Sequence, residues 1–419
     1  MLTATRLSRF RAVCADLHSV QRVAILFWAI LIVAVTVRVA VARKDAGSVF
    51  PVYRTAATAW VDGVDLYTLD FSKPCFRYHP LIAAVFVPLN ALPEKAAAIL
   101  WRFLGVVLLL VGLDRWQRQF LSLSPVECGW FFLLTAPLAL QSFNNGQVNL
   151  HLIGLLLLAM VAADQQRWTA AALLLAVATV FKLYPIAIGL LMMISLPRIF
   201  ALRYSLMLLG GCILPFLLQG PAYVSGQYRL WLEYLFVDVR HSAAIEQAPR
   251  DLFLLVRFWF GSPPEWVYRM VQLGSAGLIA LFCIRLCHPS PTRSECVQSP
   301  TSLRVGLGLS PSSRTLTAIL HLGCLWMTLL GPSTESCTYT LLGPTAAVML
   351  IVGYARRSCL LLGLAAAGYT LLLLPVVAAA FPGGTRIQHW GPQPAGAILL
   401  FGAVIVWLCP SRPKTTIVQ

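Results

Sequence analysis

Apolar stretches long enough to cross a lipid bilayer recur along almost the whole of this 419-residue chain. A helix needs about 20 predominantly apolar residues to span a hydrocarbon core of roughly 30 Å, and residues 24–42 form the clearest such stretch. Only 11% of the residues are charged and the mean hydropathy is +0.76, whereas a typical soluble domain has about 25% charged residues. The first stretch lacks a small-residue cleavage site, as expected of a membrane anchor. The sequence therefore predicts an all-α polytopic membrane protein.

Hydropathy predicts about 12 transmembrane helices. Their expected ranges are 23–42, 94–113, 127–143, 148–164, 168–183, 185–197, 204–219, 266–285, 315–331, 338–355, 358–380 and 395–409. Pro185 interrupts a continuous apolar stretch, so the fifth and sixth ranges are either two spans or one broken helix. Residues 80–92 are apolar but short, which suits a helix that dips into the membrane or lies on it.

The charge pattern predicts how the chain is threaded through the membrane. The net charge of +16 comes from Lys and Arg scattered at span ends, which is typical of topology signals and argues against a nucleic-acid partner. We expect a single transmembrane domain over 23–409, with 1–22 and 410–419 as cytoplasmic ends. Two long outer segments then cover 43–93 and 220–264, and a Ser/Pro/Thr-rich linker covers 286–314 on the cytoplasmic side. Most acidic residues fall in the outer segments, so polar chemistry is expected on the outer face.

The first outer segment is the most informative part of the chain. It contains Asp45, Asp62, Asp65 and Asp70, and each carboxylate must stay in water or be paired. No acidic cluster has the spacing that demands a metal, although Asp62 and Asp65 leave that question open.

An amphipathic helix is expected within this segment. Tyr53, Ala56, Ala57, Trp60 and Val61 recur at helical spacing and form one apolar face. Gly63 is expected to end the helix. The helix is either a plain interfacial anchor or a platform that holds carboxylates beside lipid head groups.

Three further segments carry candidate chemistry. The amides of Asn144–Asn149 either cap a helix or bind a sugar or phosphate, and His151 lies one turn into the next span. Lys182 ends an apolar stretch and either snorkels to the interface or holds a phosphate as a point charge. Glu335 lies in a short outer turn within residues 331–344.

Two groups of residues leave structural questions open. Arg38, Arg102 and Arg269 fall inside apolar stretches and need partners. Cys75 and Cys337 both fall on the expected outer side, where a disulfide between them is an option.

These segments occur in the order, and near the spacing, of glycosyltransferase family 87, which the chain resembles over about residues 20–355. The matching residues are Tyr53, Ala56, Gly63, Tyr67, Tyr78, Pro80, Pro88, Leu89, Trp101, Gly146, Gln147, Asn149, Lys182, Pro185, Pro332 and Pro344. The family comprises polyprenol-phosphate-sugar-dependent mannosyl- and hexosyltransferases with a GT-C fold.

The resemblance implies a mechanism and partners. A polyprenyl-phosphate sugar donor docks from the membrane on the outer side of a plasma membrane. A hydroxyl of a lipid or glycan acceptor attacks the anomeric carbon with inversion. A carboxylate of the first outer loop serves as general base, and basic side chains stabilise the phosphate that leaves. The resemblance implies neither a cofactor nor a metal.

Site residues follow from the same resemblance. Asp45 is the first candidate base and Glu335 the second. The expected substrate-binding residues are Tyr53, Arg54, Tyr67, Arg77, Tyr78, Gln147, Asn149, Lys182 and Tyr339, with Lys182 on the phosphate.

The sequence departs from the family pattern in two places. The family aspartate normally stands four residues before the tyrosine that matches Tyr53, where this chain has Val49. Asp45 lies one helical turn earlier, and such a shift returns it to the same face. The histidine often found in the late motif is also absent, and Glu335 is the candidate for its role. Two alternatives therefore stay open, a transporter or flippase with paired repeats and an inactive relative that serves as a partner subunit.

Overall fold

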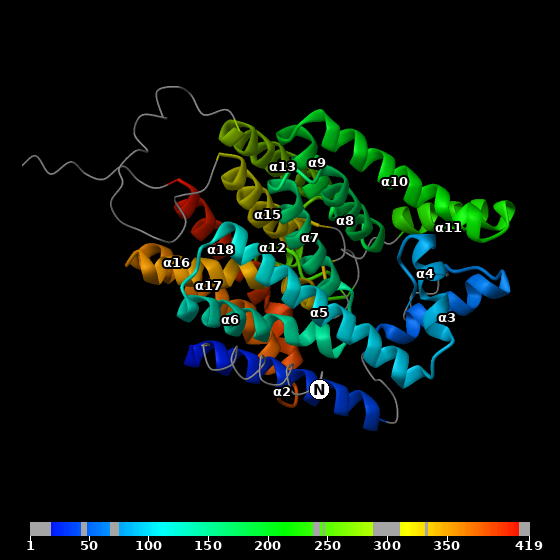
Figure 1. Ribbon diagram of the computed structural model, residues 1–419, viewed down its shortest axis with the longest axis horizontal. Helices are drawn as coiled ribbons and strands as arrows, with labels where there is room; N and C mark the ends of the chain where they lie inside the picture. Colours follow the sequence, from blue (N-terminus) through cyan, green and yellow to red (C-terminus); the bar gives the residue numbers. More distant parts are fainter. Residues whose placement is uncertain are drawn as a thin grey trace, which may run out of the picture.

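The computed structural model describes residues 18–42, 48–67, 75–237, 244–245, 248–287, 311–331 and 334–409. These residues form helices and connecting turns, with no strand in the described ranges, which confirms the predicted all-α membrane fold. Figure 1 shows the helices as one bundle.

Eighteen helical elements are described in chain order. The first nine are α2 (Ser19–Val41), α3 (Phe50–Asp62), α4 (Pro80–Asn90), α5 (Glu94–Phe120), α6 (Pro125–Asn144), α7 (Asn149–Asp164), α8 (Trp168–Phe181), α9 (Ile186–Ser195) and α10 (Arg198–Leu218). The others are α11 (Pro221–Val237), α12 (Leu252–Phe260), α13 (Glu265–Cys287), α15 (Pro311–Leu330), η3 (Ser336–Leu342), α16 (Gly343–Ala355), α17 (Cys359–Ala378), η4 (Gly384–Trp390) and α18 (Pro392–Leu408).

Each of the 12 expected spans coincides with a helical element, but not every element is long enough to cross a membrane. Eight described helices meet the length and hydropathy that a span needs, or nine if η4 and α18, bent by 52°, count as one span. The apolar helices α7, α8 and α9 have 16, 14 and 10 residues, and 16 residues rise only about 24 Å. The break at Lys182–Pro185 separates α8 from α9, so Pro185 does interrupt the stretch. The figure of 12 spans is therefore not confirmed.

Helix α7 is the centre of the bundle. It packs against α5, α6, α8, α15 and η3, and most of its residues are buried on every side. Close approach to α5 depends on small residues, because a Cβ on Gly154 would lie 2.6 Å from the backbone of Leu108. A short apolar helix surrounded by protein needs no lipid contact along its sides, which explains why α7 is apolar all round.

The outer helices of the bundle expose apolar side chains. Along α10, Leu202, Leu206, Leu209, Ile213 and Leu217 are all exposed, and their spacing of three to four residues places them on one side of the helix. An apolar surface of this size suits hydrocarbon rather than water. Helix α10 is thus a lipid-facing span, in agreement with the membrane class.

The amphipathic helix expected within residues 43–93 is confirmed as α3, and Gly63 ends it in the left-handed conformation at φ 68°. Tyr53, Ala56, Ala57 and Trp60 are buried as expected, but Val61 is 60% exposed. The buried face of α3 packs on α4. The apolar periodicity therefore reflects packing against protein.

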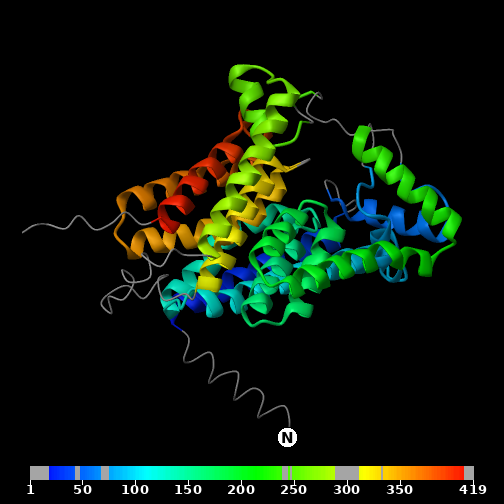
Figure 2. The ribbon, with the colours of Figure 1, turned by 90° about the horizontal axis from the view of Figure 1, so that it is seen from above.

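Helices α3 and α4 lie together at one end of the molecule, next to α11 (Figure 1). Turned by 90°, the blue and green segments of these helices and of α10 form one side of the bundle, opposite the orange and red segments of α16–α18 (Figure 2). Helix α11 of the segment 220–264 therefore packs on α4 of the segment 43–93, although they are far apart in sequence.

Candidate functional site

The turn between α6 and α7 sets the position of two predicted site residues, Gln147 and Asn149. Gly146 makes the turn in the left-handed conformation at φ 63°, which costs glycine little. A Cβ there would also lie 3.2 Å from the Arg102 guanidinium. The turn sends both amide side chains into the bundle, where Gln147 is 5% exposed and Asn149 is fully buried.

Glu335 lies directly before η3, and its carboxylate meets the side chain of Gln147. The Oε2 atom accepts a hydrogen bond from Gln147 Nε2 at 2.9 Å and a weaker one from Cys337 Sγ at 3.5 Å. The backbone N–H of Glu335 donates to Thr338 Oγ1 at 3.2 Å. This late segment is thereby joined to the α6–α7 turn, with Glu335 still partly exposed.

Lys182 meets Asn149 at the end of α8. Its backbone is extended, with φ −145° and ψ 137°, and its Nζ donates to Asn149 Oδ1 at 3.0 Å. Tyr184 donates to the same oxygen at 3.2 Å, while Asn149 Nδ2 donates to the carbonyl of Cys337 at 3.0 Å. The buried Asn149 amide thus bridges Lys182 to the Glu335 segment, and Lys182 itself stays partly exposed.

Two predicted tyrosines, Tyr53 and Tyr78, feel the charge of the Glu335 carboxylate, and a third, Tyr67, is hydrogen-bonded to Tyr78. Tyr53 donates from its hydroxyl to that of Tyr78 at 2.8 Å, and Tyr67 donates to the Tyr78 carbonyl at 2.7 Å. Burial raises the pKa of Tyr78, and the nearby Glu335 charge raises it further. Burial also raises the pKa of Tyr53. The tyrosines therefore stay neutral near pH 7, and the hydroxyls of Tyr53 and Tyr78 lie within electrostatic reach of Glu335.

Helix α11 bonds the segments next to Tyr67 and Tyr78. Arg77 Nε donates to Tyr234 Oη at 2.7 Å, and Gln227 bonds one of these segments with both ends of its amide. Gln227 Oε1 accepts from the backbone of Leu66, and its Nε2 donates to Asp65 Oδ1, each at 2.9 Å. These contacts, which periodicity within one segment does not reveal, hold Asp65, Leu66 and Arg77 against α11.

Other predicted site residues lie elsewhere. Arg54 donates to the carbonyl of Leu92 at 3.0 Å on an exposed surface. Tyr339 is buried, and its hydroxyl donates to the carbonyl of Arg250 at 2.6 Å. Asp45, the first candidate base, lies outside the described residues.

Two buried hydroxyl groups beside the candidate site, those of Ser142 and Thr340, were not predicted from the sequence. Ser142 donates to the carbonyl of Cys337 at 2.7 Å, and Thr340 donates to Ser142 Oγ at 2.8 Å. Both are fully or almost fully buried hydroxyls. Their only sequence signal is a small polar residue in an apolar stretch, which is common in membrane helices.

The question of partners for the intramembrane arginines is partly answered. Arg102 is 3% exposed and donates to backbone carbonyls. Arg38 donates to the Asn144 carbonyl at 2.8 Å, and Arg269 lies 3.6 Å from Glu265 in an exposed pair. Cys75 and Cys337 form no disulfide with each other. Among the described residues, no three His, Cys, Asp or Glu side chains gather where a metal ion would bind.

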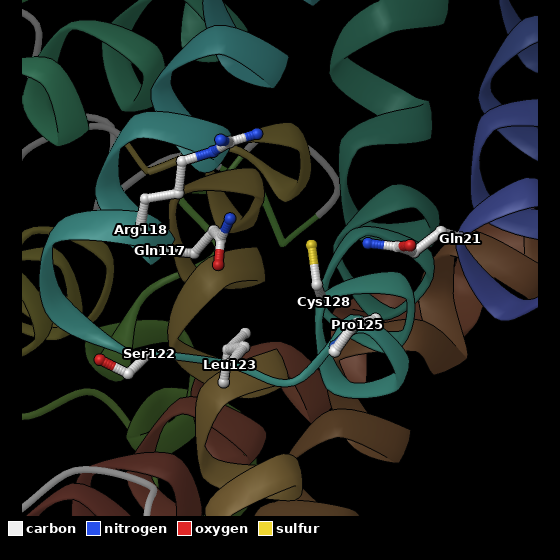
Figure 3. A pocket seen from close by; sticks show the side chains of 7 residues that line it. All are labelled: Gln21, Gln117, Arg118, Ser122, Leu123, Pro125 and Cys128. Atoms are coloured by element: carbon white, nitrogen blue, oxygen red, sulfur yellow. The ribbon is translucent and has the colours of Figure 1, made fainter. Parts of the chain in front are cut away.

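An open pocket of about 340 Å³ lies near the other ends of α5 and α6. Figure 3 shows the side chains that line it, among them Gln21, Gln117, Arg118 and Cys128. These residues lie at the start of α2 and α6 and at the end of α5, whereas Gln147 follows the end of α6. The pocket is therefore separate from the Gln147–Glu335 site.

Comparison with known proteins matches this chain to the family that its sequence motifs resemble. A sequence model of glycosyltransferase family 87 matches residues 76–311, which is more than half of the chain. Tyr78, Gln147, Asn149 and Lys182 lie within the matched range, whereas Glu335 lies beyond it.

Two curated relatives share a name, polyprenol-phosphate-mannose-dependent alpha-(1-2)-phosphatidylinositol pentamannoside mannosyltransferase. The protein from Mycolicibacterium smegmatis is 35% identical over 128 residues, or 29% of this chain and 30% of the relative. The protein from Mycobacterium tuberculosis is 34% identical over 146 residues, or 33% of this chain and 32% of the relative. The chain thus spans about a third of the length of the relatives it matches.

Proposed function

Because the chain belongs to glycosyltransferase family 87, we propose that it is a membrane hexosyltransferase that uses a polyprenyl-phosphate sugar donor. The observation that carries this proposal is the meeting of Gln147, Asn149, Lys182 and Glu335. These residues come from three distant segments and are linked by hydrogen bonds of 2.9 and 3.0 Å. A carboxylate and an ammonium group, each partly exposed, then lie on either side of buried amides. That arrangement suits a reaction in which a proton is removed and a phosphate leaves.

Lys182 is the proposed contact for the donor phosphate. Its ammonium group is a compact point charge at the end of a helix, and its bond to Asn149 Oδ1 holds it in place. The phosphate carries negative charge as it departs, and a fixed cation lowers the energy of that charge. Since both relatives are named for polyprenol-phosphate-mannose, we take a mannose-like hexose as the sugar.

Glu335 and Asp45 are the two candidates for the base. A base takes the proton of the acceptor hydroxyl while the hydroxyl oxygen bonds to the anomeric carbon. The bond from that carbon to the phosphate oxygen breaks, and its electron pair leaves with the polyprenyl phosphate, so the anomeric centre inverts. Glu335 fits this role because the Gln147 amide orients its carboxylate. Asp45 stays in the proposal on the strength of the family pattern.

The acceptor is proposed to be a lipid or a glycan, and we propose that the reaction occurs on the outer face of the plasma membrane. The relatives' name includes phosphatidylinositol pentamannoside, a lipid-linked glycan. The charge pattern supports the outer face, since more of the Lys and Arg residues fall in the expected cytoplasmic segments than in the segments 43–93 and 220–264.

Sugar transfer in proteoliposomes tests the proposal. Radiolabelled polyprenyl-phosphate mannose or glucose is supplied with a lipid-glycan extract, and transfer by the wild-type protein is compared with Asp45→Asn. Label moved to lipid or glycan by the wild type, and not by the variant, supports both the class and Asp45 as base. Transfer that survives this substitution keeps the class and moves the base to Glu335. Label that crosses the bilayer still attached to the donor would instead favour a flippase, and no transfer from either donor would contradict the proposal.

A further inference from the structure

The last carbonyl groups of α6 have lost their partners within the helix, as at every helix end. Two arginines from other helices bond the last two of them. Arg102 Nε of α5 donates to Phe143 O at 3.2 Å, and its second terminal nitrogen donates to Asn144 O at 3.0 Å. Arg38 of α2 donates to the same Asn144 oxygen at 2.8 Å. Two cations thus lie at the negative end of the α6 dipole.

The next two carbonyls are also bonded from outside the helix. Asn145 O accepts from the backbone N–H of Val49, where α3 begins, at 3.0 Å. Gly146 O accepts from the indole Nε1 of Trp101 at 2.9 Å. Four consecutive carbonyls, from Phe143 to Gly146, are therefore each held by a donor on α2, α5 or the start of α3.

Trp101 links this turn to the rest of the site. Its ring stacks on His151 of α7 with centroids 3.8 Å apart and meets the edge of Tyr53 at 5.8 Å. The peptide unit whose oxygen it bonds ends at the nitrogen of Gln147. A rotation of that unit would swing the Gln147 side chain, whose amide bonds Glu335.

We propose that Trp101 is a positioning residue: its indole N–H fixes the Gly146 carbonyl and thereby aims Gln147 at Glu335. The expected effect on catalysis rests on the proposed function. The orientation of Gln147 by Trp101 rests on the structure alone. Trp101 itself bonds backbone, so it is not assigned to substrate or to proton transfer.

The test is Trp101→Phe, which keeps an aromatic ring and removes the N–H. Trp116→Phe is a matched control, because Trp116 is on the same helix and fully buried, and its Nε1 has no hydrogen-bond partner in the described structure. We expect Trp101→Phe to lower kcat about five- to tenfold, the effect of one lost neutral hydrogen bond. KM for the donor should stay within about twofold, because Lys182 is held separately, whereas Trp116→Phe should leave kcat unchanged.

A double variant separates positioning from a general folding defect. If Trp101 acts through Gln147, adding Trp101→Phe to Gln147→Ala should lower kcat by less than about twofold further. If the two losses multiply, Trp101 supports the fold rather than Gln147, and the proposal is wrong.

Amide hydrogen exchange tests whether Trp101 fixes the α6–α7 turn, without any assay of sugar transfer. Trp101→Phe should speed exchange in peptides covering residues 141–149, and Trp116→Phe should not. Equal exchange in the two variants would overturn the inference. Should Trp101→Phe fail to fold, Arg38→Lys, which weakens the same turn from α2, should speed exchange in the same peptides. If the wild-type protein protects residues 141–149 from exchange but transfers no sugar, the proposed function is wrong, whereas the orientation of Gln147 by Trp101 still holds.

Discussion

Replacing Glu335 by glutamine is the most direct perturbation of the proposed site. The substitution keeps the size of the side chain and its ability to accept a hydrogen bond from Gln147 Nε2. In the wild-type structure that nitrogen lies 2.9 Å from Glu335 Oε2. It removes the negative charge and the capacity to take a proton. General-base catalysis contributes about 10²- to 10⁴-fold, which corresponds to about 3–5 kcal/mol of transition-state stabilisation. We therefore expect kcat for Glu335→Gln to fall by at least about 10².

Stability should change much less than activity. The amide–carboxylate bond becomes an amide–amide bond, and the difference between charged and neutral hydrogen bonds is about 1 kcal/mol. Glu335→Asp gives a second measure, because it keeps the charge but withdraws the carboxylate by about 1.5 Å, the length of one carbon–carbon bond. A misplacement of about 1 Å can cost 10²-fold in rate, so this variant should also be nearly inactive.

The assay is transfer from radiolabelled polyprenyl-phosphate mannose in proteoliposomes, with melting temperature measured on the same preparations. Glu265→Gln is the control, since it makes the same chemical change at an exposed glutamate at the start of α13. If Glu335→Gln retains transfer within about threefold of the wild type, Glu335 is not the base. A loss of Asp45→Asn activity in the same experiment would then assign the role to Asp45.

Three further outcomes follow from the structure. Lys182→Gln should raise KM for the donor about tenfold, since it removes the charge opposite the phosphate, and an unchanged donor KM would remove Lys182 from the phosphate site. Burial lowers the pKa of His79 from 6.5 to about 4, so the folded protein favours the neutral imidazole. The contribution of His79 to the free energy of unfolding is therefore complete above pH 6.5 and falls by up to about 3 kcal/mol as the pH drops towards 4. Melting curves from pH 7.5 to 4.5 should therefore slope less for His79→Gln than for the wild type, and equal slopes would contradict this. Gly189→Ala should lower the melting temperature, because its Cβ would lie 2.4 Å from the ring of Tyr204, whereas Gly210→Ala meets nothing within 4 Å and should raise stability by up to about 1 kcal/mol.

Local patterns in the sequence were enough to predict the helices. Each expected span coincides with a helical element, and α3 covers the residues with the predicted helical periodicity and ends at Gly63 as predicted. Such predictions succeed because hydropathy, periodicity and caps depend on residues within a turn or two of each other. The number of helices that cross the membrane does not follow in this way. Helix α7 is apolar because protein surrounds it, and the sequence does not distinguish such a helix from one surrounded by lipid.

Residue types and family motifs also predicted Gln147, Asn149, Lys182 and Glu335 as site candidates. What they did not predict is that Gln147 bonds Glu335 across 188 positions of sequence and that Asn149 bonds Lys182 across 33. Likewise, Val49 and Trp101 lie in segments that look unrelated to the α6–α7 turn until their donors are seen on its carbonyls.

The division has a physical cause. The sequence by itself determined the class of protein, the helices and the chemical groups at their ends, because each of these depends on neighbours along the chain. Only the tertiary structure decided which of those ends meet. Helix packing depends on which surfaces fit each other, such as Gly154 against Leu108, and that fit involves residues from two distant segments at once. The polar groups at the ends of α6 and α8 were readable in advance, whereas their arrangement around one carboxylate follows from how the bundle packs.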